Sequence, residues 1–562
     1  MKVERMILLY VTVFFMIVAS IAEEDSSITF RIIHITDVYT LDNFASLKTL
    51  IDSKSRESGI DKAISLLSGD FLMPYLLSSL DGGKSMMRMI NAIPIDFLTW
   101  GNHEKDLPHD QLMLREQEYK GIWINTNMQS HESFANSSCQ VDHETIVIDR
   151  GNHIRKIGLL GILTNSESLY PPGSFNGAII EDPWETMRTY SKLLRKDVDL
   201  LLPICHLYET QDERTAREFD FPLIIGGHDH HAVDRIINGT RLLKPGSDSE
   251  FARIIDITWE KQGDGNMTIT TELLTVKDFH PNADIQQMAK EAYGILRPLR
   301  ETQFGFISEN FRPLTSRGAR SNRISIATYL ATILRDALNL DAVVFKGGNI
   351  RGSRDYDDDE HFSMEMLQSE LENVDVYVTQ ILGSVLEVGL HETWTQPNAG
   401  WLQYDEGISV DFLGRVTMVK HKPIVAERMY RIASFHDFFR KHDSPTIGLY
   451  YEKHPDIIRV RNDNVYSIIR RHMARIAWKD LVGKLDSNAD GQLKKSEVSN
   501  IDINHNSQID KEDILFALEH VLKFRIHHGY FGFAEEILME GILQHAIAVP
   551  RLLDENYSFE RK

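Results

Sequence analysis

Short apolar runs that each end in a polar cluster constrain the first half of the chain more than any other feature. The runs are Phe30–Ile35, Ala63–Leu67, Asp96–Trp100, Lys156–Leu163, Val198–Ile204 and Pro222–Ile225. Runs of this length are typical of buried strands whose carboxyl ends present side chains. The stretches between them, such as Phe44–Ser53 and Trp184–Leu194, have helical spacing of apolar residues. The pattern predicts an α/β layered domain with its functional site at the strand ends.

Five of these strand ends carry side chains that bind metal ions. They are Asp37-Val38-Tyr39, Gly69-Asp70, Gly101-Asn102-His103-Glu104, His206, and Gly226-Gly227-His228-Asp229-His230-His231. Two cations held ~3.5–4 Å apart need a shared carboxylate, further carboxylate or amide oxygens, and imidazoles. This set supplies all three, and the glycines beside the ligands leave room for a phosphate. One such cluster alone is usually a turn, but five in this order indicate a two-metal site.

These motifs resemble those of the calcineurin-like metallophosphoesterases of the 5′-nucleotidase family. The resemblance is carried by Ile32–Tyr39, Leu66–Asp70, Gly101–Asp106, His206, Gly227–His230 and Lys244-Pro245-Gly246. It implies an α/β fold: a four-layer metallophosphoesterase-type sandwich followed by a smaller α/β C-terminal domain. We expect a helical, EF-hand-like tail after these two domains.

The resemblance also implies a role for each polar residue. The implied metal ligands are Asp37, Asp70, Asn102, His206, His228 and His230. Asp70 would bridge two divalent or transition metal ions such as zinc, manganese or iron, whose chemistry turns water into a nucleophile near neutral pH. His103 and Asp106 would form a catalytic dyad that stabilises the phosphoryl transition state and protonates the leaving oxygen.

The first motif departs from the family, which has Asp-x-His where this chain has Asp37-Val38-Tyr39. A phenol in place of an imidazole either removes one ligand or supplies a phenolate. One interpretation is a weakened first metal site with lower activity. The other is a site that prefers a harder, more charged ion. We expect an active site in which Tyr39 alters the metal preference.

A second unit begins near residue 285 with the helical stretch Ile285–Leu296. The family's Asn-Gly-Gly-x-Ile-Arg motif corresponds here to Lys346–Arg351, so the resemblance implies that Arg351 binds substrate together with Asn102. A surface ion pair is the alternative for Arg351. The family's Gly-Gly-Asp-Gly-Phe loop, which carries a base-stacking Phe, is missing near Tyr430–Phe439. The sequence therefore supports phosphoester hydrolysis more directly than it supports a nucleotide as the substrate.

The C-terminal tail contains two loops with calcium-ligand spacing. Residues 486–497 offer Asp486, Asn488, Asp490, Gln492 and Glu497 at EF-hand ligand positions, with Gly491 at the sharp turn. Residues 502–513 offer Asp502, Asn504, Asn506, Gln508 and Asp513. The final Asp513 is shorter than the usual Glu, and four residues separate the loops. We therefore expect calcium to stabilise the tail, with a polar turn as the alternative for the second loop.

Residues 1–22 have the pattern of a secretory signal peptide, with Lys2, Arg5, the apolar run Met6–Ala19 and a small-x-small end at Ala22. That run is too short to span a ~30 Å hydrocarbon core, and we expect no membrane anchor elsewhere. Asn-x-Ser/Thr acceptor sites for glycosylation stand at Asn136, Asn238, Asn266 and Asn556. A disulfide between Cys139 and Cys205 is left open by the sequence.

The negative net charge of the chain limits the kinds of molecule that it is expected to bind. With 61 Lys+Arg against 82 Asp+Glu, the net charge is −21, which disfavours polymeric nucleic acid and anionic membranes. A small-molecule phosphate ester, foremost a nucleotide, remains compatible where metal ions receive it. The sequence does not predict the oligomeric state.

The predicted order is a signal peptide (1–22), a metallophosphoesterase catalytic domain (23–284), a 5′-nucleotidase-type substrate domain (285–461) and an EF-hand-like calcium-binding tail (462–562). The predicted function is that of a secreted enzyme that hydrolyses a phosphomonoester. One alternative is a cyclic-nucleotide or nucleoside-polyphosphate hydrolase. Another is a calcium-binding extracellular matrix or interaction protein on a partly decayed enzyme scaffold.

Overall fold

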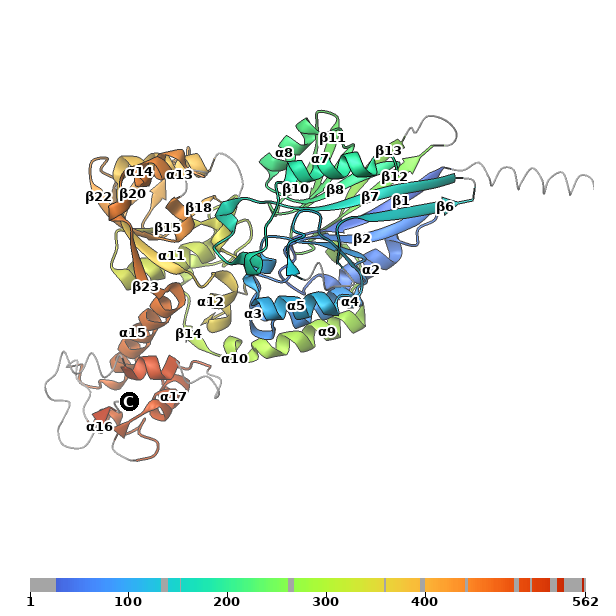
Figure 1. Ribbon diagram of the computed structural model, residues 1–562. Helices are drawn as coiled ribbons and strands as arrows, with labels where there is room; N and C mark the ends of the chain where they lie inside the picture. Colours follow the sequence, from blue (N-terminus) through green and yellow to red (C-terminus); the bar gives the residue numbers. More distant parts are fainter. Residues whose placement is uncertain are drawn as a thin grey trace, which may run out of the picture. The chain divides into compact units, whose positions relative to one another are not determined.

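The computed structural model of the chain comprises two compact units, Met1–Gly294 and Ile295–Lys562 (Figure 1). It describes residues 27–132, 140–151, 153–260, 267–357, 360–394, 400–439, 443–489, 495–505, 508–525, 533–539 and 558–559. The predicted signal peptide lies outside these residues. Each unit is described by itself.

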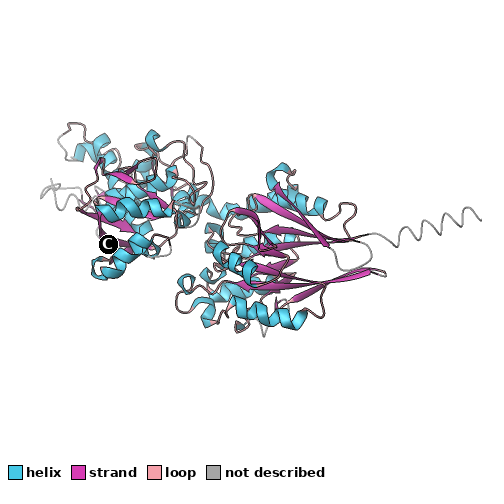
Figure 2. Cartoon of the chain, turned by 90° about the horizontal axis from the view of Figure 1, so that it is seen from above, coloured by secondary structure: helices cyan, strands magenta, loops and turns pink. Residues whose placement is uncertain are grey.

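The first unit contains two sheets with helices on their outer faces (Figure 2). One sheet has the strand order β13-β12-β1-β2-β3-β4-β5. Its strands are β1 (Ile28–Ile35), β2 (Lys62–Ser68), β3 (Phe97–Thr99), β4 (Ile122–Ile124), β5 (Gln140–Val141), β12 (Phe251–Trp259) and β13 (Met267–Thr275). The other sheet has the order β10-β11-β9-β8-β7-β6. Its strands are β6 (Glu144–Arg150), β7 (His153–Leu163), β8 (Leu200–His206), β9 (Leu223–Gly226), β10 (Ala232–Ile237) and β11 (Thr240–Pro245).

Helices cover the outer face of each sheet (Figure 1). Those on the side of the first sheet are α2 (Phe44–Lys54), α3 (Leu76–Asp81), α4 (Lys84–Ala92), α5 (His109–Glu118) and α9 (Ala283–Tyr293). Those on the side of the second sheet are α7 (Pro183–Leu194) and α8 (Glu209–Glu218). The predicted strands at the six apolar runs and the predicted helices at α2 and α7 are confirmed.

Three clusters of buried apolar side chains separate four layers. Phe30 and Ile32 of β1 belong to the cluster shared with β7, β8 and β9 of the other sheet. Ile33 and Ile35 of the same strand belong to the cluster shared with α2 and α4. A third cluster joins β7 and β8 to α7 and α8. Because β1 is buried on both faces, it carries apolar residues on both rather than on one, with Arg31 and His34 buried among them. The predicted four-layer α/β sandwich is confirmed.

Parallel pairing brings the strand ends of interest to one edge of each sheet. In the first sheet β1, β2, β3 and β4 are parallel neighbours. In the second sheet β7, β8 and β9 are parallel neighbours. The carboxyl ends of parallel strands meet at the same edge, where α/β folds bind ligands.

The second unit contains a smaller α/β structure, and further helices of the same unit follow its sheet in the chain. Its five-stranded sheet has the order β18-β15-β22-β17-β23. The strands are β15 (Ala342–Lys346), β17 (Asp375–Leu382), β18 (Leu402–Tyr404), β22 (Met429–Ser434) and β23 (Arg459–Asn464). The longer helices are α11 (Ser325–Leu338), α13 (Gly383–Thr393), α14 (Pro445–Lys453), α15 (Val465–Leu485) and α17 (Lys511–His520). Within the described ranges, no helix combines the length and apolar character needed to cross a membrane.

The two units meet in the chain between Gly294 and Ile295. Helix α9 contacts α2 and α4 and belongs to the first unit. The finer division into four segments stays a prediction.

Candidate metal centre

The predicted ligand residues come together at the carboxyl ends of strands from both sheets of the first unit. Asp37, Asp70 and Asn102 follow β1, β2 and β3. His206 ends β8, and His228 and His230 follow β9. Asp37, Asp70, Asn102 and His206 are buried, and the two remaining histidines are half-buried.

Carboxylates and imidazoles lie within contact distance of one another in this cluster. His206 Nε2 lies 3.0 Å from Asp70 Oδ2, and His230 Nε2 lies 3.3 Å from Asp37 Oδ1. One ligand atom each from Asp70, His206 and His228 lies within 4.8 Å of the others. Asp70 is thus grouped with His206 and His228, and Asp37 is grouped with His230.

Buried polar atoms in the cluster are left without protein partners. Among the described residues, Asn102 Oδ1 and His228 Nδ1 are buried and have no hydrogen-bond partner. A buried acceptor that stays unpaired costs ~1–3 kcal/mol, so its presence in a native site calls for a ligand. Oxygen and imidazole donors in this mixture suit zinc, manganese or iron. The residues present therefore fit a two-metal centre.

The electrostatics of the cluster favour a cation. Burial lowers the pKa of His206, but the Asp70 carboxylate outweighs burial and raises it to about 10. Burial would raise the pKa of Asp37 and of Asp70, but the neighbouring histidines hold both below the ordinary value. Burial and the charge of His206 lower the pKa of His228 to about 3, which keeps it a neutral ligand.

A backbone hydrogen bond orients His206 toward the cluster. Its Nδ1 lies 2.8 Å from the carbonyl oxygen of Ser68. A carbonyl oxygen only accepts hydrogen bonds, so Nδ1 must carry the proton of this bond. Nε2 is then the nitrogen that faces Asp70, and it is available to a metal. Partners of this kind fix the tautomer of metal-binding histidines.

Four of the ligand residues have left-handed backbone conformations. The φ angles are 52° at Asp37, 53° at Asp70, 82° at His228 and 63° at His230. Such conformations are costly for residues with a Cβ and cluster at functional sites, where surrounding structure enforces them. The neighbouring Gly101 leaves no space for a side chain, because a Cβ there would lie 2.2 Å from both the amide nitrogen and Oδ1 of Asp70.

Glu104 holds the strand ends that carry Asp70 and Asn102. Its fully buried carboxylate accepts hydrogen bonds from the backbone N–H groups of Gly101 (2.7 Å), Phe71 (2.8 Å), Asp70 (3.1 Å) and Leu72 (3.2 Å). Burial and the Asp70 charge raise its pKa to about 7. The sequence analysis missed this role, although Glu104 stands in the Gly-Asn-His-Glu motif.

His103 and Asp106 form the hydrogen-bonded pair that the sequence predicts. His103 Nδ1 lies 2.5 Å from Asp106 Oδ2, and the His103 amide donates to Asp70 Oδ1 at 2.7 Å. Burial raises the pKa of Asp106, but the charges of His103 and Lys105 outweigh it and lower the pKa. The pair is adjacent to the predicted bridging carboxylate.

Tyr39 places its hydroxyl among the ligand atoms. The oxygen lies 3.0 Å from His230 Nε2 and 3.3 Å from both Asp37 Oδ1 and Asp70 Oδ2. The Tyr39 amide donates to Asp248 Oδ1 at 2.8 Å, which fixes this turn. The phenol is therefore within reach of any ion held by Asp37 and His230.

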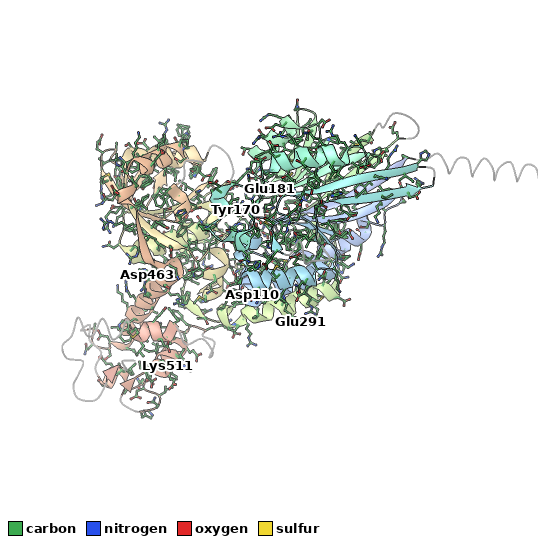
Figure 3. The ribbon with its side chains drawn as sticks, in the orientation of Figure 1. Asp110, Tyr170, Glu181, Glu291, Asp463 and Lys511 are labelled. Atoms are coloured by element: carbon green, nitrogen blue, oxygen red, sulfur yellow. The ribbon has the colours of Figure 1, made fainter. Side chains whose placement is uncertain are left out.

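Tyr170 is a further residue near the centre that the sequence analysis missed. It lies on the segment between β7 and α7 (Figure 3), and its hydroxyl donates to the Thr164 carbonyl oxygen at 2.7 Å. Burial and the charge on Asp70 raise its pKa well above the ordinary value. No motif in the sequence distinguishes this tyrosine from the others.

The second unit holds the predicted substrate-binding arginine in an ion pair. Arg351 Nε and Nη2 donate to Glu372 Oε1 at 2.8 and 2.5 Å. Lys346, which stands where the family has Asn, is buried and pairs with Asp443. The role of Arg351 in binding substrate stays a prediction.

Both predicted calcium loops close through the same contact. Glu497 accepts the Ser487 N–H at 2.8 Å, and Asp513 accepts the Ile503 N–H at 2.9 Å. These are loop positions two and twelve in each case. Predicted ligands for which the described residues include side chains are Asp486, Asn488, Glu497, Asp502, Asn504 and Asp513. Those outside them are Asp490, Gln492, Asn506 and the Gln508 side chain.

The remaining predictions fall partly outside the described residues. Asn238 is exposed in the turn between β10 and β11. The other predicted glycosylation sites, Asn136, Asn266 and Asn556, lie outside. Cys205 is a buried free thiol in β8, and Cys139 lies outside.

The strands and motifs that carry the candidate metal centre match a known protein family. The family model for calcineurin-like phosphoesterases matches residues 30–232. Residues 30–232 thus form a calcineurin-like phosphoesterase domain, a domain of metal-dependent phosphoester hydrolases. A search of curated proteins gives no match.

Solved structures share the fold at low sequence identity. A 5′-nucleotidase precursor from Thermus thermophilus is 14% identical, with 79% of this chain and 96% of that chain covered and a TM-score of 0.58. Sulfate thiohydrolase SoxB from the same organism, in complex with glycerol, is 13% identical, with 76% and 80% covered and a TM-score of 0.54. A Staphylococcus aureus protein provisionally assigned as a 5′-nucleotidase, in complex with α-ketoglutarate, is 15% identical, with 78% and 96% covered and a TM-score of 0.54.

Proposed function

We propose, from the calcineurin-like phosphoesterase domain at residues 30–232, that the protein is a secreted two-metal enzyme that hydrolyses a phosphomonoester. The observation that carries the proposal is the convergence of Asp37, Asp70, Asn102, His206, His228 and His230 at the strand ends of both sheets. In this proposal Asp70, Asp37 and His230 would hold one ion, and Asp70, Asn102, His206 and His228 would hold the other.

The chain's own residues supply orientation and the proton. Two bound metal ions would supply positive charge for the phosphoryl oxygens and lower the pKa of water. His103 would donate a proton to the leaving oxygen from Nε2, because Nδ1 is held by Asp106 at 2.5 Å. The same hydrogen bond fixes the direction of the imidazole ring, so Asp106 acts through His103.

A nucleotide is the substrate we propose. Support comes from the shared fold with 5′-nucleotidase structures and from Arg351, whose guanidinium suits a phosphate or carboxylate. Arg351 would have to exchange Glu372 for the substrate, because its Nε and Nη2 both donate to that carboxylate. A cyclic nucleotide or nucleoside polyphosphate is the second choice, since a two-metal centre suits both.

Hydrolysis of a panel of esters, followed by analysis of the products, tests the proposal. The panel contains nucleoside monophosphates, cyclic nucleotides, nucleoside polyphosphates and sugar phosphates, each with zinc, manganese or iron. We expect monophosphate hydrolysis that Asp70→Asn abolishes. If no metal supports hydrolysis of any ester, read as released phosphate or, for a cyclic nucleotide, as the nucleoside monophosphate formed, the scaffold no longer acts as an enzyme and the calcium-binding interaction protein becomes the better account.

We also propose that calcium binds the tail. The support is that Glu497 and Asp513, the closing carboxylates of the two loops, make equivalent contacts to loop position two. Burial and the charges of Asp510 and Asp502 raise the pKa of Asp513 to about 6. Calorimetry of the whole protein with calcium and with chelator tests this assignment.

A further inference from the structure

Lys244 lies at the end of β11 and is almost completely buried behind the metal centre, with 1% of its side chain exposed. Its ammonium group donates to the carbonyl oxygens of Gly227 (2.7 Å) and Leu207 (3.0 Å) and to the Asp229 carboxylate (2.6 Å). It also pairs with Asp212 of α8 at 2.7 Å. Burying an ammonium group costs several kcal/mol, so every one of its protons needs a partner.

Three of these four partners are chain neighbours of metal ligands. Leu207 follows His206, Gly227 precedes His228, and Asp229 separates His228 from His230. One ammonium group thus joins the end of β8 to the turn after β9. Gly226 makes room for it, because a Cβ at Gly226 would lie 3.0 Å from Lys244 Cε.

We propose that Lys244 is a positioning residue that holds the three histidine ligands in the geometry the metals require. The proposal rests on the two-metal function above. His228 and His230 have φ angles of 82° and 63°, and a turn in this conformation relaxes unless neighbouring groups hold it. Lys244 supplies that restraint from outside the ligand set, and it contacts neither substrate nor metal.

Two substitutions separate positioning from general stability. Lys244→Met keeps the length of the side chain and removes every tether. Asp212→Asn weakens the same buried ion pair but leaves the contacts to Leu207, Gly227 and Asp229. Burial raises the pKa of Asp212 to about 7, although the Lys244 ammonium lowers it. The uncharged side chain of Asn therefore resembles protonated Asp212, which the folded protein already accommodates.

The experiment measures zinc and manganese affinity of the full chain by competition with a chromophoric chelator, alongside urea unfolding of the metal-free protein. We expect Lys244→Met to unfold at lower urea. Only Lys244→Met should lose metal affinity, by about 10–100-fold, as when an outer partner of a metal ligand is removed. If Lys244→Met does not fold, Asp229→Asn, which keeps the lysine and weakens one tether, should lower affinity by a smaller factor.

Two results would overturn the proposal. Lys244→Met could bind metal as tightly as the wild type, or Asp212→Asn could lose as much affinity as Lys244→Met. The first of these results would leave the proposed function intact, provided that the wild-type protein binds metal and hydrolyses esters. A wild type that takes up no metal would overturn both proposals.

Discussion

Glu104 offers the sharpest test of how the first sheet holds its ligands. Its carboxylate accepts four backbone N–H groups, at 2.7 to 3.2 Å, from two strand ends. Glu104→Ala would leave those donors buried without a partner, at a cost of ~1–3 kcal/mol each. Even at the lower bound, four donors give a loss of about 4 kcal/mol, a large part of the ~5–15 kcal/mol stability of a typical domain.

The side chain of Gln keeps one acceptor oxygen and turns an amide group toward the other pair of donors. Glu104→Gln should therefore leave two donors unpaired and cost about half as much, ~2 kcal/mol on the same lower bound. Both variants should also weaken metal binding, because Asp70 and Gly101 are among the residues whose amides lose a partner.

Urea unfolding of the metal-free protein and chelator competition measure the two effects. Glu116→Ala is the matched control, since Glu116 is also a buried carboxylate of the first unit and bonds to Gln140 instead of to a ligand-bearing turn. We expect it to lower stability and leave metal affinity unchanged. Glu104→Ala with a loss below about 1 kcal/mol and unchanged metal affinity would refute the assignment of Glu104 as the tie between the strand ends.

Four further outcomes are expected. Tyr39→His should increase affinity for zinc and manganese and remove the visible absorption band of a ferric phenolate, as titration with each ion would show; an unchanged preference would place Tyr39 outside the ligand set. Because burial raises the pKa of Asp212 to about 7, the folded state favours its protonated form, so metal-free wild type should lose stability as the pH rises from about 4 through 7; Asp212→Asn should flatten that slope in urea unfolding at stepped pH. Glu497→Gln should abolish the rise in melting temperature that calcium gives, and a preserved rise would contradict the calcium assignment. Arg351→Ala should raise KM for nucleoside monophosphates more than it lowers kcat, whereas unchanged steady-state kinetics would leave Arg351 a structural ion pair.

Sequence reasoning predicts the sandwich because both of its physical signals are local. A strand buried on two faces carries apolar residues on both, and Phe30–Ile35 does so, with inner and outer residues in different clusters. The polar ends of the strands are equally local, so the set from Asp37 to His230 can be named before its geometry is known. Parallel pairing then brings those ends to one edge of each sheet.

The supporting roles of Glu104 and Lys244 could not be predicted in the same way, although both residues stand in motifs that the sequence shows. Their importance lies in backbone groups that are distant in sequence, such as Phe71 for Glu104 and Leu207 for Lys244. Nearly all residues have backbone N–H and carbonyl groups, so no pattern of side chains in the sequence predicts these contacts. Tyr170 was missed for a similar reason, because it lies on a long segment between β7 and α7 that carries no motif.

The two supporting residues have opposite charges, and each suits the backbone groups that it holds. Glu104, an anion, gathers amide N–H groups at the ends of β2 and β3. Lys244, a cation, gathers carbonyl groups beyond the ends of β8 and β9. Each therefore satisfies polar backbone atoms that irregular turns leave without sheet partners. On the proposed assignment, one charged side chain supports the strand ends that carry Asp70 and Asn102, and another supports those that carry the three histidines. Asp70 and Asp37 would then take their compensating charge from the metals.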